Sequence, residues 1–228
     1  MGGVIVALPL TSGPVALFLV LEQGPAFAAG ASLGSMAGAL AQGVFCLGYS
    51  ALAARGWPLA FAGGTAAFAV IGLVLQRLAL PLIPLSLVVA VGLAAAMVAM
   101  PRGQEARRLA PPPAWDIPAR MVVATTLVLA LTAAAAALGP RLSGLLATFP
   151  VYAGILAVFG HHHDGVGPAT RALRGLLAGL FGFAAFFAVI AALIERVGTA
   201  PAFAAALVVT MVLQALALAL VREAPAPG

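Results

Sequence analysis

Residues 3–55 read GVIVALPLTSGPVALFLVLEQGPAFAAGASLGSMAGALAQGVFCLGYSALAAR, and this pattern decides the fold because it returns later in the chain. Shifted by 141 positions, residues 3–55 align without a gap with residues 144–196. The matched pairs are Gly3 and Gly144, Pro9 and Pro150, Phe18 and Phe159, Gly24 and Gly165, Gly34 and Gly175, Gly38 and Gly179, Phe45 and Phe186, and Arg55 and Arg196. Recurring glycine, proline and arginine are not explained by a high alanine content. The sequence therefore indicates an internal duplication.

The composition excludes a soluble domain. Of the 228 residues, 64% are hydrophobic and 7% are charged, and the mean hydropathy is +1.16. A soluble fold needs a polar surface that so few polar residues do not supply. Apolar runs of about 18 to 25 residues follow one another, as in transmembrane helices. The sequence therefore predicts a multi-pass integral membrane protein.

The basic residues are all arginine, 11 in number, and the chain is rich in alanine. Together these features predict a bacterial protein of the inner membrane. The arginines stand singly at helix ends, so the net positive charge does not indicate binding to nucleic acid. Cys46 is the one cysteine, which excludes an intramolecular disulfide or a cysteine metal site.

Apolar runs and helix breakers predict an all-α transmembrane bundle of about eight spans. Residues 1–100 form the first repeat, 101–118 a cytoplasmic linker and 119–228 the second repeat. The first repeat is expected to lack the helix that opens the second one. The expected spans are 3–21, 26–54, 58–76, 80–100, 119–138, 143–159, 168–194 and 200–221.

The arginines predict how the chain is oriented. With eight spans, eight arginines fall on one side of the membrane and three on the other, and the richer side is the cytoplasm. Both termini and the linker are then cytoplasmic. Five spans separate Gly3 from Gly144, so the repeats are expected to be inverted relative to each other. If residues 3–21 and 143–159 instead re-enter the membrane, four spans separate the copies and the repeats are parallel.

Two matched proline and glycine stretches predict a substrate site. Proline removes a backbone donor and glycine loosens a helix, and unwound backbone within a membrane survives only where protein buries it or a cavity adjoins it. Paired interruptions in matched segments are a pointer to a transporter site, although they can also be kinks that touch no ligand. The candidate substrate-binding residues are Pro9, Thr11, Ser12, Gly13, Pro14, Gln42, Tyr49, Thr148, Pro150 and Tyr152.

Other motifs favour structural interpretations. The series Gly30, Gly34 and Gly38 predicts close helix packing. Its G-x-S-x-G spelling lacks the strand–turn–helix context and the histidine–acid partner of a serine hydrolase, so we expect no enzyme.

The run from His161 to Asp164 has metal-binding residue types at an unsuitable spacing, and we expect a solvated loop there with no metal site. No Asp or Glu lies near the middle of an expected span, which argues against a carboxylate-based proton path.

The element Gly139-Pro-Arg-Leu-Ser-Gly-Leu-Leu-Ala-Thr-Phe-Pro150 resembles a segment of poorly characterised bacterial inner-membrane families, including the GlpM-like proteins. Residues 2–9 are a degenerate copy of part of it. The inverted five-plus-five plan is also similar to that of the drug/metabolite transporter superfamily. The resemblance implies a membrane protein and brings no activity with it.

We therefore expect a small inner-membrane transporter or permease, with its site between the two interrupted helices. The alternative is a non-transporting subunit or scaffold that packs a partner on its glycine-rich faces. Expected partners are the lipid bilayer, a small solute or ion and a second copy of the chain in a homodimer. No cofactor is expected.

Overall fold

The computed structural model describes residues 12–101, 118, 121–123, 125–126, 129 and 148–223. These residues are helical, without a strand among them, so the expected all-α class is confirmed for this part of the chain. The 3-10 turn η1, Ala53–Arg55, extends the end of α3. The α-helices are α2 (Ser12–Gln23), α3 (Pro25–Leu52), α4 (Trp57–Leu78), α5 (Leu82–Ala99), α8 (Val151–Asp164), α9 (Val166–Val197) and α10 (Thr199–Glu223).

Among the described residues, five helices are long and apolar enough to cross a membrane: Pro25–Arg55, Trp57–Leu78, Leu82–Ala99, Val166–Val197 and Thr199–Leu216. They agree with five of the eight expected spans to within a few residues at each end.

The other three expected spans are described only in part. Residues 119–138 and the linker at 101–118 lie almost wholly outside the described residues. The expected spans 3–21 and 143–159 appear there as α2 and α8, of 12 and 14 residues. At 1.5 Å per residue these helices are about 18 and 21 Å long, whereas a membrane core is about 30 Å thick. As described, α8 is too short to be a span, and the residues that precede α2 lie outside the described part of the chain.

The same glycine joint follows each short helix. Gly24 separates α2 from α3 with φ 86° and ψ 169°, and Gly165 separates α8 from α9 with φ 88° and ψ −176°. Side chains with a Cβ almost never adopt this region, so glycine is required to stop one helix and start the next at an angle. In both copies a proline follows within the first turn of the long helix, at Pro25 and Pro168, where a missing backbone N–H costs nothing. The duplicated sequence thus produces duplicated local structure.

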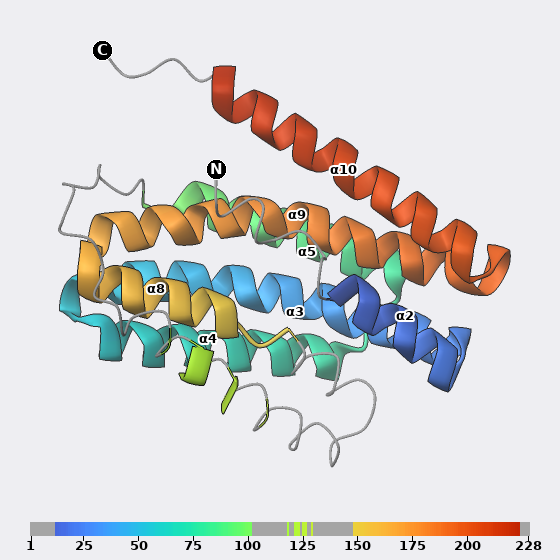
Figure 1. Ribbon diagram of the computed structural model, residues 1–228, viewed down its shortest axis with the longest axis horizontal. Coiled ribbons are helices and arrows are strands. Elements are labelled where there is room, and N and C mark those ends of the chain that lie inside the picture. Colours follow the sequence, from blue (N-terminus) through green and yellow to red (C-terminus); the bar gives the residue numbers. More distant parts are fainter. Residues whose placement is uncertain are drawn as a thin grey trace.

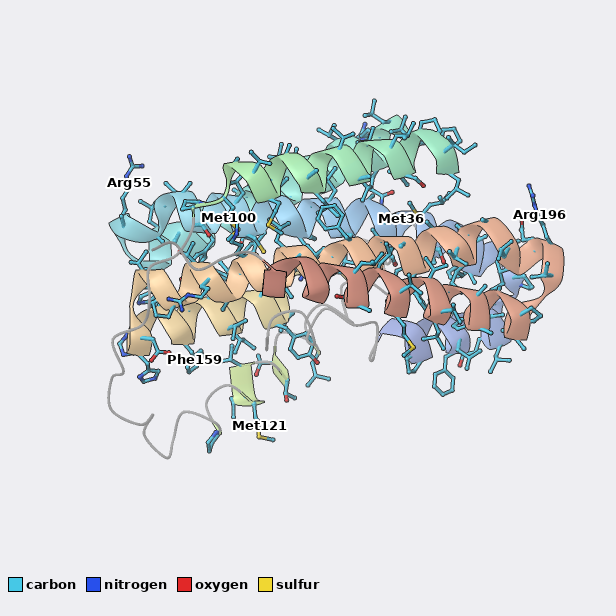
Figure 2. The ribbon with its side chains drawn as sticks, turned by 90° about the horizontal axis from the view of Figure 1, so that it is seen from above. Met36, Arg55, Met100, Met121, Phe159 and Arg196 are labelled. Carbon is cyan, nitrogen blue, oxygen red and sulfur yellow. The ribbon has the colours of Figure 1, made fainter. Side chains whose placement is uncertain are left out.

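The long helices α3 and α9 pack against each other at the centre of the bundle (Figure 1). On α3 lie α2 and α4, and on α9 lie α8 and α10, so each unit repeats the order short helix, long helix, outer helix. The helix α5 contacts both long helices. The two long helices run in opposite directions (Figure 1), and the matched residues Arg55 and Arg196 lie at opposite ends of the bundle (Figure 2).

The core between the units is apolar and closely packed. Phe45 and Cys46 on α3 and Leu173 and Leu177 on α9 have no exposed surface. Gly43 lets the helices approach, because an added Cβ would lie 2.7 Å from Leu93 and 3.0 Å from Leu177. The outer faces of α4, α5 and α10 expose valine, leucine and isoleucine instead of charge, as lipid-facing surfaces do. Apolar, outward-facing helices of this length fit a membrane protein.

Candidate functional site

The short helix α8 begins near the middle of the bundle and not at its end. Thr148, two residues before Pro150, packs directly on Gly38, which stands halfway along α3. A Cβ at Gly38 would collide with the Thr148 side chain, so a glycine here is what lets the second repeat reach the backbone of the first. Pro150 then caps α8, whose first backbone N–H groups are those of Val151 and its successors. Figure 1 shows α8 alongside one half of the bundle and α2 alongside the other half.

A cavity of about 670 Å³ opens between α4 and α8. One wall is formed by Trp57 and Phe61 of α4, and the other by α8, on which Figure 2 labels Phe159. Gly154 makes room for the Phe61 ring, because an added Cβ would lie 2.7 Å from Phe61 Cε2. We call this cavity the groove. The residues that line it are Trp57, Phe61, Val122, Val123, Thr126, Phe149, Pro150, Val151, Gly154, Ile155, Val158, Phe159 and His162.

The chemistry of the groove is apolar with few polar side chains. Among its lining residues, only Thr126, Trp57 and His162 carry side-chain hydrogen-bonding groups. His162 is the third residue from the end of α8, and Trp57 begins α4. Both therefore lie toward the same end of the bundle as Arg55. The groove can accept an apolar chain along α8, with a polar group directed to that end.

No protein-family model, curated protein or solved structure matches the chain. The resemblance to GlpM-like families stays a prediction, and the function must be argued from the geometry.

A second feature joins the two repeats beside the groove. Tyr49, in the last turn of α3, has no exposed surface, and its hydroxyl oxygen lies 3.1 Å from Nδ1 of His161 on α8. The two rings meet edge to face, with centroids 6.1 Å apart and planes at 72°. Phe45 continues the contact toward the groove, since its ring packs against both Tyr49 and Phe61. An aromatic column of Phe61, Phe45, Tyr49 and His161 therefore connects α4, α3 and α8.

The histidine run is part of a helix, which corrects the expected solvated loop. His161, His162 and His163 form the last turn of α8, where a helix C-terminus favours positive charge. Consecutive helical residues point in different directions, and here His161 faces Tyr49 while His162 lines the groove. Desolvation lowers the pKa of His161 below its ordinary value of 6.5. Within the described residues, no group of three or more His, Cys, Asp or Glu side chains could hold a metal ion.

Of the ten predicted substrate residues, Pro150 lines the groove. Pro9 and Thr11 lie outside the described residues, and Ser12 begins α2. Gly13 is buried at the start of α2, close to Phe186, whereas Pro14 is exposed. The remaining four do not line the groove: Gln42 is half-buried on α3, Tyr49 bonds His161, Thr148 packs on Gly38, and Tyr152 is 60% exposed on α8.

The residues that sequence reasoning missed are the aromatic walls of the groove and His161. Trp57 and Phe61 have no distinguishing pattern in an apolar span, so no sequence signal could have selected them. The histidines did carry a signal, since three ionisable residues directly after an apolar run are unusual in this chain. Their neighbours across the bundle were not visible in the sequence.

The polar side chains within the spans mostly bond to helix carbonyls. Ser32 donates to Ala28 O at 2.8 Å and Thr210 to Ala206 O at 2.8 Å. Gln214 donates from Nε2 to Gly179 O at 3.2 Å, which ties α10 to α9. Arg174 of α9 donates to Met97 O and Met100 O, at 3.0 and 2.7 Å, and so caps the last turn of α5. These groups hold the bundle together and do not surround the groove.

Proposed function

We propose that this chain is a small multi-pass transporter of the bacterial inner membrane, which moves an amphipathic solute with an apolar chain. One observation carries the proposal: the two matched helical units run in opposite directions, with Arg55 and Arg196 at opposite ends of the bundle (Figure 2). The proposal assigns the chain no catalytic step, no cofactor and no resident metal.

Two similar units that run in opposite directions suit transport, because such units provide a direct route to alternating access. Two similar half-structures related by an axis in the membrane plane can exchange inward-open and outward-open roles. We infer that residues 1–100 and 119–228 are such inverted repeats, with α8 crossing only part of the membrane. The short helix α8 then acts as a half-helix that starts within the membrane, and Gly24 and Gly165 act as joints between the short and the long helices.

The groove indicates the class of solute. Its volume falls within the range of small-molecule sites, and its walls are aromatic and aliphatic. An apolar chain gains little free energy by moving from lipid into the groove, because lipid tails are as apolar as the groove walls. The groove therefore discriminates between solutes by shape and by contact with their polar group. His162 and Trp57 are the contacts that we propose for that polar group. We keep Pro9, Thr11, Ser12 and Tyr152 as predicted contacts of the solute elsewhere along its route through the protein.

Charge at the two ends supports a cytoplasmic location for the end with Arg55. Arg171 and Arg174, near the start of α9, share this end, while Arg77 and Arg196 close helices at the other end. The arginine-rich linker adjoins the end of α5 at the same side. More arginine on one side predicts the cytoplasmic side, and both termini are then cytoplasmic.

Reconstitution tests the proposal. The full chain is placed in liposomes with a fluorescent (NBD-labelled) lysophospholipid, and dithionite added outside measures how fast the inner pool becomes accessible. We expect faster movement than in protein-free liposomes. Val158→Phe, which puts a ring into the groove, should slow it several-fold. The matched control Leu87→Phe, at an exposed position of α5, should not. A wild-type rate equal to that of protein-free liposomes, or an unaffected Val158→Phe, would overturn this proposal.

A scaffold without transport activity is the second candidate, and a specific observation favours it. The interface between α3 and α9 is filled by apolar side chains, and Ser32, Thr210 and Gln214 are bonded to helix carbonyls. A centre filled by apolar side chains is what a packing subunit needs. The scaffold proposal predicts protein-free rates in the same assay and a partner, or a second copy in a homodimer, that cross-links to the purified chain in membranes.

A further inference from the structure

We propose that His161 is a proton-binding site whose protonation loosens α8 from α3 and opens the groove. The geometry that carries the proposal is the contact between His161 on one repeat and the fully buried Tyr49 on the other, next to the groove wall. Its use in transport rests on the proposed function, whereas proton binding and helix movement do not.

The hydrogen bond between the two residues depends on the charge of the imidazole. In neutral His161, Nδ1 can accept the proton of the Tyr49 hydroxyl while Nε2 carries the ring hydrogen. A proton taken from water binds Nδ1, and the charged ring then has only donors. Nδ1–H must donate to the tyrosine oxygen, and the tyrosine hydrogen must find another acceptor. No bond between heavy atoms forms or breaks, and Tyr49 keeps its own proton.

The surroundings of Tyr49 do not supply that acceptor. Among the described residues, His161 is the hydrogen-bond partner of the Tyr49 hydroxyl, and the nearest ring, that of Phe45, is apolar. A buried hydroxyl without a partner is unfavourable, and so is a charge at the edge of an apolar core. Protonation therefore makes the docked position of α8 less stable, and movement of the helix lets water reach both groups.

Other ionisable groups lie toward this end of the bundle. On its own helix are His162, His163 and Asp164, and on the neighbouring elements are Arg55 of η1 and Arg171 and Arg174 of α9. The charge on α4, Arg77, lies at the far end of that helix. Burial, and not these charges, is what lowers the pKa of His161.

The sign of the pH dependence follows. Burial lowers the pKa of His161 in the docked state. Neutral His161 therefore stabilises docking fully above the ordinary pKa of 6.5, and this stabilisation is lost as the pH falls through the lowered pKa. The helix α8 is thus docked at neutral pH and released in acid. If the end with Arg55 is cytoplasmic, acidification of the cytoplasm is the signal.

Movement of α8 against α4 gives a direct test, because both carry groove residues. A bimane fluorophore on Val158→Cys of α8 is quenched by Trp57 of α4 when the helices are docked. The full chain carries Cys46→Ala and Trp115→Phe, so that the introduced cysteine is the only labelling site and Trp57 is the only tryptophan. Ile155→Cys provides a second labelling position on the same wall, and Trp57→Phe reports the unquenched signal.

We expect bimane emission to rise as pH falls, with a midpoint below 6.5. His161→Gln should remove the transition, whereas the matched control His163→Gln, at a position that does not line the groove, should retain it. Tyr49→Phe removes the hydroxyl that stabilises neutral His161, so the midpoint should move up toward 6.5. A signal independent of pH at both labelling positions, or a transition that persists in His161→Gln, overturns the proposal.

Failure of this proposal and failure of the proposed function give different results. A flat bimane titration with normal lysophospholipid movement rejects the proton site alone. A clear titration in a chain that moves no lysophospholipid keeps the proton site and rejects transport of this solute.

Discussion

At the scale of single residues, Gly38 is the position where the two repeats come closest. The Thr148 side chain occupies the space that a Cβ at Gly38 would need, halfway along the central helix. This contact fixes how deep into the bundle α8 begins, and therefore where the groove ends. A glycine that was expected to serve only general helix packing has a defined partner.

We predict that Gly38→Ala destabilises the bundle by about 1–3 kcal/mol, the usual cost of overpacking a closed contact. The control is Gly30→Ala on the same helix, where an added Cβ meets nothing within 4 Å. Alanine is the better helix former by about 0.5–1 kcal/mol, so the control should be neutral or slightly stabilised. Thermal unfolding in detergent measures both, and the double variant Gly38→Ala with Thr148→Gly should recover part of the loss. Equal melting temperatures for the two single variants would show that Thr148 does not occupy this space.

Individual roles were the part that the sequence predicted least. Tyr49 was selected for its polarity within a span, but its partner, His161, is 112 positions away and its pairing depends on tertiary packing. Arg174 was grouped with arginines at helix ends, and the fold shows that it bonds two carbonyl oxygens at the end of α5. Residue type shows what a side chain can do, whereas the fold decides what it meets.

At the scale of elements, hydropathy and breakers located five long helices because each is a continuous apolar run bounded by glycine or proline. They did not locate the start of α8. An apolar run of span length does not reveal whether the helix occupies all of it, and Pro150 starts α8 well inside the expected span. The pattern of apolar residues is the same for a full span and for a half-helix, so only the fold separates them.

The matched joints provide the element-scale prediction. Gly24→Ala and Gly165→Ala should each cost about 1–3 kcal/mol, because φ near 86–88° with extended ψ is open essentially to glycine alone. Space is not the reason, since an added Cβ at either position meets nothing within 4 Å. Thermal unfolding of each variant, with Gly30→Ala as the control of equal size, measures the cost. If both variants have the melting temperature of the wild type, Gly24 and Gly165 are not required to set the angle between the short and the long helices.

At the scale of the whole molecule, the two long helices that match in sequence, α3 and α9, run in opposite directions (Figure 1). Each unit is built around one long helix, and the two long helices share the apolar core. A charge matched in sequence, Arg55 or Arg196, therefore emerges at opposite ends (Figure 2). The proposed alternating access requires that these two ends lie on opposite sides of the membrane.

Labelling from the two sides of the membrane tests that orientation. Gln23 and Asp164 are matched residues, and both are exposed, at the ends of α2 and α8. Single cysteines at these positions are introduced with Cys46→Ala, since Cys46 is fully buried and a small apolar residue best keeps its packing. In intact cells, a membrane-impermeant maleimide should label the Gln23 position, and the Asp164 position only after lysis, because the end with Arg55, Arg171 and Arg174 is the cytoplasmic one. Labelling of both positions from the same side would mean that the matched units are parallel in the membrane. The mechanism of alternating access would then lose its basis, and the scaffold would become the better account of the fold.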